Sequence, residues 1–235
     1  MKITAGLFVM ITVLAISTML LSVTPVNAQT AAAAQTQDDY LKVINNRAAK
    51  IVAAFHSSDT VFTKKVTAVV AEQYISLGRI HDGRNAKIKE IKSKGTELTA
   101  DDKAAIQKLE AKADKKLEKL HKSYLKKLSA LCTPQQIDEI KNGMTFNVLN
   151  VTYTAYQDML LTLTEEQKKQ ILAWLTEARE KAMDAESADK KHAVFGKYKG
   201  RINNYLSAAG IDMKKEEAAW QQRIKERKAA AKQSK

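Results

Sequence analysis

The chain has 235 residues, and 39 Lys and Arg against 26 Asp and Glu give it a formal net charge of +13. Its single cysteine, Cys132, excludes an internal disulfide, so packing alone must stabilise the fold. The excess positive charge favours polyanionic partners, and the alternative is a lysine-rich solvated surface without a partner.

The first 28 residues have the pattern of a secretory signal peptide. Lys2 precedes an apolar run over residues 6–21, and Val26 and Ala28 are small residues at the cleavage positions. We expect cleavage after Ala28 and a periplasmic or secreted mature protein in a Gram-negative envelope. It is not a lipoprotein, because no cysteine follows the apolar run. An uncleaved membrane anchor is the alternative, and no later segment is long and apolar enough to span a bilayer. Export makes acidic polysaccharide, anionic lipid or cell-wall polymer better candidate partners than nucleic acid.

Helix-forming residues dominate the rest of the chain, and Pro134 is its only proline after the signal. We expect a flexible leader over residues 29–37 and a first helix over 38–56. The break at residues 57–60 can cap a second helix that continues to about residue 94.

A third helix over residues 100–131 has the clearest periodicity. Its apolar residues step by three and four from Ile106 to Leu128, as in a coiled-coil seam, and lysines fill its other faces. We predict that it packs antiparallel on the preceding helix, so that residues 80–131 form a long, projecting, lysine-rich hairpin.

The C-terminal part predicts shorter helices with recognisable caps. Thr133 and Pro134 begin one, and Gly143 ends it. The β-rich stretch 146–156 has no partner strand, so we interpret it as an extended buried connector. A capping box at Thr164 and Gln167 begins the next helix. Ser187 caps the helix after it, which Gly210 ends, and Asp212 caps the last helix. The sequence thus predicts an all-α antiparallel helical bundle, with one domain over residues 38–224 and a basic tail, 225–235, that frays.

Three C-terminal segments carry a resemblance to a known family. They are TYxAYxxML from Thr152, ILAWLTEAREKAMD from Ile171 and KHAVFGKYKGRINNYLSAAGID from Lys191. Together with IHDGRNAKIKEIK, LHKSYLKKLSA and IDEIKNGMT upstream, they resemble the bacterial domain of unknown function 3826 over roughly residues 40–222. The resemblance implies an exported all-helical domain with no established activity, described as sugar-binding, and it supplies no site residues.

A weaker likeness concerns Thr133-Pro134-Gln135-Gln136 and residues 163–167, which look like the two LTxxQ motifs of Spy-type periplasmic chaperones. Cys132 replaces the leucine of the first motif. Both segments can also be ordinary helix caps.

The candidate ligand-binding residues lie in the block 187–212, which combines cationic, amide and aromatic groups. Lys197, Arg201 and Asn204 share one helical face, where they could bind carboxylate or hydroxyl groups. Tyr198 and Trp174 could stack on sugar rings. The alternatives are core packing for the aromatic residues and interhelix hydrogen bonds for the polar ones.

Catalysis has less support in the sequence, because no nucleophile, phosphate-binding or dinucleotide motif occurs. If the protein is an enzyme, His81, Asp82 and His192 are the candidate catalytic residues; the alternative for His81 and Asp82 is an interhelix polar contact. The four histidines are scattered, so no metal and no cofactor is expected. The acidic row of Glu177, Glu180 and Asp184 is expected to be a solvated face.

The sequence therefore favours a non-enzymatic module that binds a saccharide, acidic rather than neutral. A Spy-like chaperone or structural envelope factor is the alternative, and a carbohydrate-active enzyme is a third possibility. A deep pocket beside the block 187–212 would favour ligand binding or catalysis, and an exposed, concave, pocketless surface would favour the chaperone.

Overall fold

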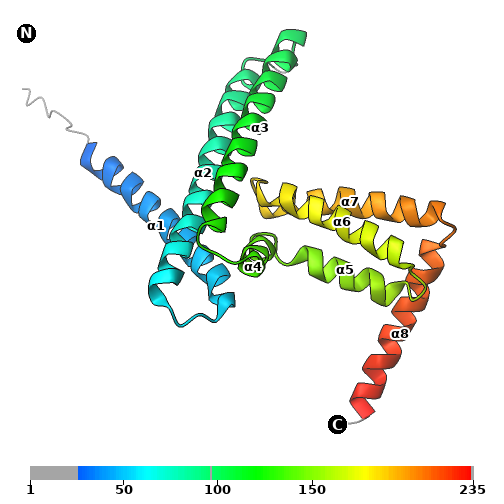
Figure 1. The fold of residues 1–235 in the computed structure, drawn as a ribbon. Coiled ribbons are helices and arrows are strands. Elements are labelled where there is room, and N and C mark those ends of the chain that lie inside the picture. Colours follow the sequence, from blue (N-terminus) through cyan, green and yellow to red (C-terminus); the bar gives the residue numbers. More distant parts are fainter. Residues whose placement is uncertain (1–25, 96, 234–235) are drawn as a thin grey trace, which may run out of the picture. The chain divides into compact units, whose positions relative to one another are not determined.

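The computed structural model describes residues 26–95 and 97–233, which form eight α-helices, a short 3₁₀ helix and no strand (Figure 1). The predicted all-α fold is therefore confirmed for this part of the chain. The chain divides into two compact units, residues 1–40 and residues 41–235. The predicted signal peptide lies outside the described residues as far as residue 25. In the part that the structure describes, no helix has the length and apolar character needed to cross a membrane.

Helix α1, Val26–Val52, belongs to both units and begins before the predicted start at residue 38. Alanine and glutamine favour helix, which accounts for the earlier start. In the second unit, its residues Ile44, Ala48 and Val52 are buried. The 3₁₀ helix η1, Ala53–Phe55, follows α1 directly. His56, which comes after it, has a left-handed backbone conformation.

Helices α2, Thr60–Lys92, and α3, Ala100–Ser129, lie side by side as the predicted hairpin (Figure 1). The Asp59 carboxylate caps α2 by accepting the Val61 and Phe62 amide protons, both at 2.9 Å. No described residue between 82 and 112 is buried, so the tip half of the hairpin is stabilised only by a half-buried seam. The base is firmly packed, and its buried residues include Tyr124 and Leu128.

The C-terminal helices are α4, Pro134–Met144; α5, Val148–Met159; α6, Glu165–Met183; α7, Ala188–Ala208; and α8, Met213–Gln233. The predicted caps at Thr133, Thr164 and Ser187 are all formed. Asp212 accepts the Lys214 and Lys215 amide protons at 3.1 Å, as expected of a cap for α8. Helix α8 continues through most of the predicted basic tail.

The prediction of an extended connector over residues 146–156 is wrong, because this stretch forms α5. Leu149 and Tyr156 lie seven residues apart, which is two helical turns, and both are buried against the C-terminal core. Burial of that face outweighs the strand preference of the valines and threonines between them.

Two hydrophobic clusters form the interior of the second unit. The first joins α1, α2 and α3 to Ile140, Met144 and Met183. The second joins α5, α6 and α7. The C-terminal ends of α4 and α6 thus reach the first cluster.

Candidate functional site

The predicted ligand-binding residues fall into two groups. Lys197, Arg201 and Asn204 are exposed along α7, as their spacing predicts. Tyr198 is buried in the second cluster, and its hydroxyl accepts a hydrogen bond from the Lys181 ammonium group at 2.7 Å. Its ring is therefore part of the core.

Trp174 is half-buried and already has partners inside the protein. The Arg201 guanidinium lies 4.4 Å from the centre of its ring, and the Tyr205 ring meets it edge-on at 5.3 Å. Arg201 also lies 3.7 Å from the Glu177 carboxylate. A sugar ring could use that face of Trp174 only after Arg201 moves.

The three candidate catalytic residues do not come together. His81 is buried on α2, and its Nε2 donates to the Asp184 carbonyl oxygen at 2.8 Å. Asp82 is exposed, and His192 lies on α7 against the Phe146 ring. His81 is therefore an interhelix polar contact, which is the alternative that the sequence left open.

Both segments that look like LTxxQ motifs are helix caps. The Thr133 and Thr164 amides each donate to the glutamine three residues later, at 2.9 Å. The backbone amide of each glutamine in turn donates to the threonine hydroxyl, at 3.3 and 3.2 Å. Local capping accounts for these side chains.

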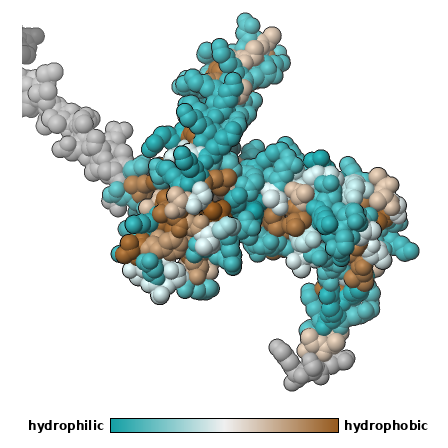
Figure 2. All heavy atoms as spheres, in the orientation of Figure 1, coloured by the Kyte–Doolittle hydropathy of each residue, from teal (hydrophilic) through white to brown (hydrophobic). Residues whose placement is uncertain are grey.

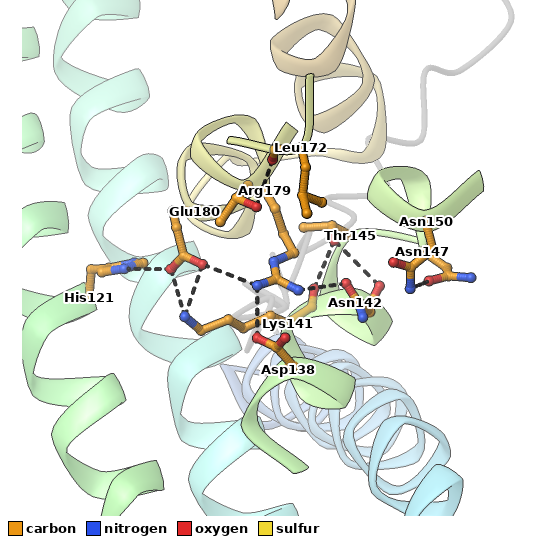
Figure 3. Close-up of polar contacts among 11 residues, drawn as sticks. His121, Asp138, Lys141, Asn142, Thr145, Asn147, Asn150, Leu172, Arg179 and Glu180 are labelled. Carbon is orange, nitrogen blue, oxygen red and sulfur yellow. Dashed lines mark hydrogen bonds and ion pairs between the residues drawn. The ribbon is translucent and has the colours of Figure 1, made fainter. Parts of the chain in front are cut away.

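A cluster of charged residues, unexpected from the sequence, joins α3, α4 and α6 (Figure 3). The Arg179 side chain is only 6% exposed and donates to Asp138 and Asn142, both at 2.8 Å. Lys141 donates to both Glu180 oxygens, at 2.9 and 3.0 Å. These contacts attach α4 to α6 by charge-assisted hydrogen bonds.

His121 on α3 completes this cluster. Its Nδ1 lies 2.8 Å from an Asp184 carboxylate oxygen, and its Nε2 lies 3.4 Å from Glu180. Contact with Asp184 and then Glu180 raises the His121 pKa to about 9. Burial alone would raise the Glu180 pKa, but His121 and Lys141 outweigh it and bring that pKa to about 2. The expected solvated face is therefore wrong for Glu180 and Asp184, which are part-buried and paired, whereas Glu177 is exposed.

Lys191 is the most unusual cation of this region. It is buried, and its ammonium group donates to the Met144 and Met183 carbonyls at 2.8 and 3.5 Å. These carbonyls belong to the last residues of α4 and α6, where the helix dipole favours a cation. Burial, helped by Arg47, nevertheless lowers the Lys191 pKa to about 8.

Phe146 is the residue that most departs from local preference. It follows α4 with φ of 57°, in the left-handed region that bulky residues avoid. The Asn147 backbone amide donates to the Asn142 carbonyl at 2.7 Å, which is the longer of the two hydrogen bonds of a Schellman motif, with Phe146 at the position usually held by glycine. Asn147 itself is also left-handed, with φ of 56°.

The end of α7 provides an internal comparison. The Ile211 amide donates to the Leu206 carbonyl at 3.1 Å, and Gly210 has φ of 86°. Both helix ends thus share this hydrogen bond around a left-handed residue, glycine in one and phenylalanine in the other, while the end of α7 also has the shorter bond from the Gly210 amide to the Ser207 carbonyl at 3.0 Å. A non-glycine residue in this conformation costs roughly 1–2 kcal/mol.

Packing does not account for a phenylalanine at this position. Phe146 is 55% exposed, and its ring stacks on His192 with a centroid distance of 5.5 Å and an interplanar angle of 10°. Asn147 and Asn150 are exposed beside it, and Asn150 donates to the Asn147 side-chain oxygen at 2.7 Å. We call Phe146, Asn147, Asn150 and His192 the aromatic–amide platform.

The described residues offer no metal site, since no three His, Cys, Asp or Glu side chains among them could hold a metal ion together. A hollow between α2 and α3, lined by Gln73 and Tyr124, has a volume of about 20 Å³. That is room for about one water molecule, which is too little for a sugar. Cys132 is buried as expected, and burial raises its thiol pKa.

A family model for a protein of unknown function, DUF3826, matches residues 41–226. The chain belongs to the DUF3826 family. The match covers nearly all of the second unit and includes every residue of the charged cluster and of the aromatic–amide platform. A search of curated proteins finds no match to the chain.

Proposed function

We propose that this DUF3826 protein is a non-enzymatic saccharide-binding module of the bacterial cell envelope, and that it binds sugar through the aromatic–amide platform. The observation that carries the proposal is Phe146, an exposed aromatic residue kept in a backbone position suited to glycine. A residue that lowers local stability without filling the core points to a role outside the fold.

The chemistry of the platform suits a sugar ring. A sugar has a face of C–H groups that packs on an aromatic ring and a rim of hydroxyls that need hydrogen-bond partners. Phe146 offers the ring. The side-chain oxygen of Asn150 and the side-chain NH₂ group of Asn147 have no partner among the described side chains. The Asn150 oxygen can therefore accept a hydrogen bond from a sugar hydroxyl, and the Asn147 NH₂ group can donate one.

The row of Lys197, Arg201 and Asn204 supports the preference for an acidic saccharide. All three are exposed on α7, but at 100° per residue they point about 120–180° away from His192, so they act through long-range charge attraction and not through contact with the same sugar ring. In this proposal they attract a carboxylate-bearing glycan, while the aromatic–amide platform provides the ring contact. Trp174 and Tyr198 serve the fold.

A glycan array probed with the mature chain tests the class, and three variants test the site. Phe146→Ala and Phe146→Gly should both abolish binding to the short oligosaccharides that the wild-type chain captures, as distinct from extended acidic polymers. Tyr40→Ala removes a different exposed aromatic residue, 40% exposed, and should leave binding unchanged. Full binding by both Phe146 variants would refute the site, and no captured glycan at all would refute the function.

One observation favours a chaperone as a second candidate. Val43 and Val61 are 54% and 61% exposed, and Figure 2 shows hydrophobic surface over this end of α1 and α2. Exposed apolar surface of this kind can bind unfolded chains. Suppression of client aggregation that is lost in Val43→Ser and Val61→Ser variants, without glycan binding, would favour this function.

A further inference from the structure

Seven lysines of α3 lie along one face of the helix. They step by three or four residues along the chain, apart from one adjacent pair: Lys108, Lys112, Lys115, Lys116, Lys119, Lys122 and Lys126. With 3.6 residues per turn they fall within about 120° of the helix circumference, and they span about 27 Å. We call these seven residues the lysine stripe.

The stripe faces solvent and is barely neutralised. All seven residues are exposed. Of these seven lysines, only Lys122 has an acidic partner among the described residues. That partner is Glu118, at 2.6 Å, and both side chains are largely exposed. Figure 2 shows the surface of the α2–α3 hairpin as mainly hydrophilic.

Within residues 108–126, the acidic residues of the same helix are kept apart from the stripe, whereas Asp101, in the first turn of α3, lies at the same angle around the helix. Glu110, Asp114 and Glu118 follow one another at intervals of four residues on another side of α3. The buried seam, which includes Ala113, Tyr124 and Leu128, occupies a third side. Positive charge is thus separated from negative charge around the helix.

This arrangement disfavours the helix on which it lies. The spacing puts like charges at i and i+4 four times, for example at Lys108 and Lys112, and each such pair costs a few tenths of a kcal/mol. Mixing glutamates into the same face would remove the repulsion without touching the core. Neither burial nor pairing in the described structure compensates for that cost, which indicates an external partner.

We infer that the lysine stripe binds an extended acidic polysaccharide along the length of α3. Lysines one turn apart repeat about every 5 Å, close to the length of one sugar unit in an extended polyuronate chain. Carboxylates along the polymer would then lie within reach of successive ammonium groups. Lysine suits this role, since its compact charge on a flexible stem does not demand one fixed geometry.

Other polyanions fit the stripe less well. Single-stranded nucleic acid needs aromatic residues on which bases stack, and the one aromatic residue of α3 among Phe, Tyr and Trp, Tyr124, is buried. A membrane surface needs apolar side chains beside the basic ones, and the stripe has none. The inference does not rest on the proposed function, because the stripe shares no residue with the aromatic–amide platform.

The test compares two triple variants of equal charge in their affinity for polygalacturonate at low and at physiological salt. Lys112→Gln, Lys115→Gln and Lys119→Gln together remove the centre of the stripe. Lys214→Gln, Lys225→Gln and Lys228→Gln together remove three exposed lysines of α8. The stripe variant should lose about tenfold in affinity and much of its salt dependence, whereas the α8 variant should change by about twofold at most.

Three results would overturn the inference. The first is equal loss in both triple variants, because net charge alone would then explain binding. The second is absence of binding to polygalacturonate. The third is tighter stripe-dependent binding to an oligonucleotide or to phosphatidylglycerol vesicles than to polygalacturonate at the same salt. Phe146→Ala should retain the salt-dependent binding, so that failure of the platform and failure of the stripe can be told apart.

Discussion

Lys191 donates a hydrogen bond to the carbonyl oxygen of Met144, 2.8 Å away, and so attaches the start of α7 to the end of α4. The carbonyl oxygen of Met183, the last residue of α6, accepts a weaker hydrogen bond from the same ammonium group at 3.5 Å. Met144 and Met183 belong to the first hydrophobic cluster, whereas Phe195, one turn beyond Lys191, belongs to the second. One buried cation therefore satisfies two helix ends and joins the two clusters.

Replacing Lys191 by Met should destabilise the protein by about 1–3 kcal/mol, because it leaves the two carbonyl oxygens without this donor. Lys190→Met is the matched control, since Lys190 is exposed on the same helix turn and should change stability by no more than about 0.5 kcal/mol. Urea unfolding of both variants measures the difference. A more stable Lys191→Met variant would show that the charge costs more to bury than its hydrogen bonds return.

The stability of the protein should fall as pH rises from 6.5 to 8, because of His121. Its pKa is 6.5 in the unfolded chain and about 9 in the folded one, so the folded state binds the proton more tightly. The contribution is complete below pH 6.5 and is lost as pH rises towards 9. Asp184, Glu180 and Lys141 are the charged groups that surround His121. We expect a loss of about 2 kcal/mol by pH 8.

His121→Gln should remove most of this slope in urea unfolding measured at a series of pH values. The range ends at pH 8 because Lys191 in the folded protein is by then about half deprotonated, and its titration has the opposite effect on stability. Its folded pKa of about 8 lies below 10.5, so its effect on stability becomes more favourable as pH rises beyond 8. An unchanged slope in His121→Gln would contradict the assignment to His121.

Much of the fold could be predicted from the sequence, because its signals are local. Apolar spacing and the caps at Asp59, Thr133 and Thr164 specify the helices without knowledge of the partners. The exception, α5, has valines and threonines that favour strands, and only its contacts with α6 and α7 stabilise a helix. Burial by distant segments has no local signature.

The charged cluster and the aromatic–amide platform were harder to predict for the same reason. Arg179 and Asp138 lie 41 residues apart, and only the packing of α4 on α6 brings them together. The platform had one usable signal: the segment ending in Gly143-Met144-Thr145-Phe146-Asn147 has its glycine three residues before the left-handed position. A helix that ends without glycine at that position requires another residue to adopt positive φ.

Arg179→Met should destabilise the protein by about 2–4 kcal/mol, because Asn142 and Glu180 lose a buried charged partner. Asp138→Asn removes the opposite end of the same contact, but the Asp138 side chain is 61% exposed and water can replace Arg179 there. That variant should cost less than about 1 kcal/mol. Equal losses in chemical unfolding would contradict the view that the buried end of the contact dominates.

Phe146 and Gly210 each follow a helix in the left-handed conformation, so variants at these two positions measure the local cost of the platform. Phe146→Gly relieves the left-handed strain but loses the contact with His192, so we expect a net change within about 1 kcal/mol of zero. Gly210→Ala places a side chain in the same conformation without compensation, and it should destabilise the protein by about 1 kcal/mol. Thermal or urea unfolding decides both. A loss of about 3 kcal/mol or more in Phe146→Gly would equal that of a core phenylalanine and would make Phe146 a structural anchor. Stability that is retained while glycan binding disappears would assign Phe146 to the ligand.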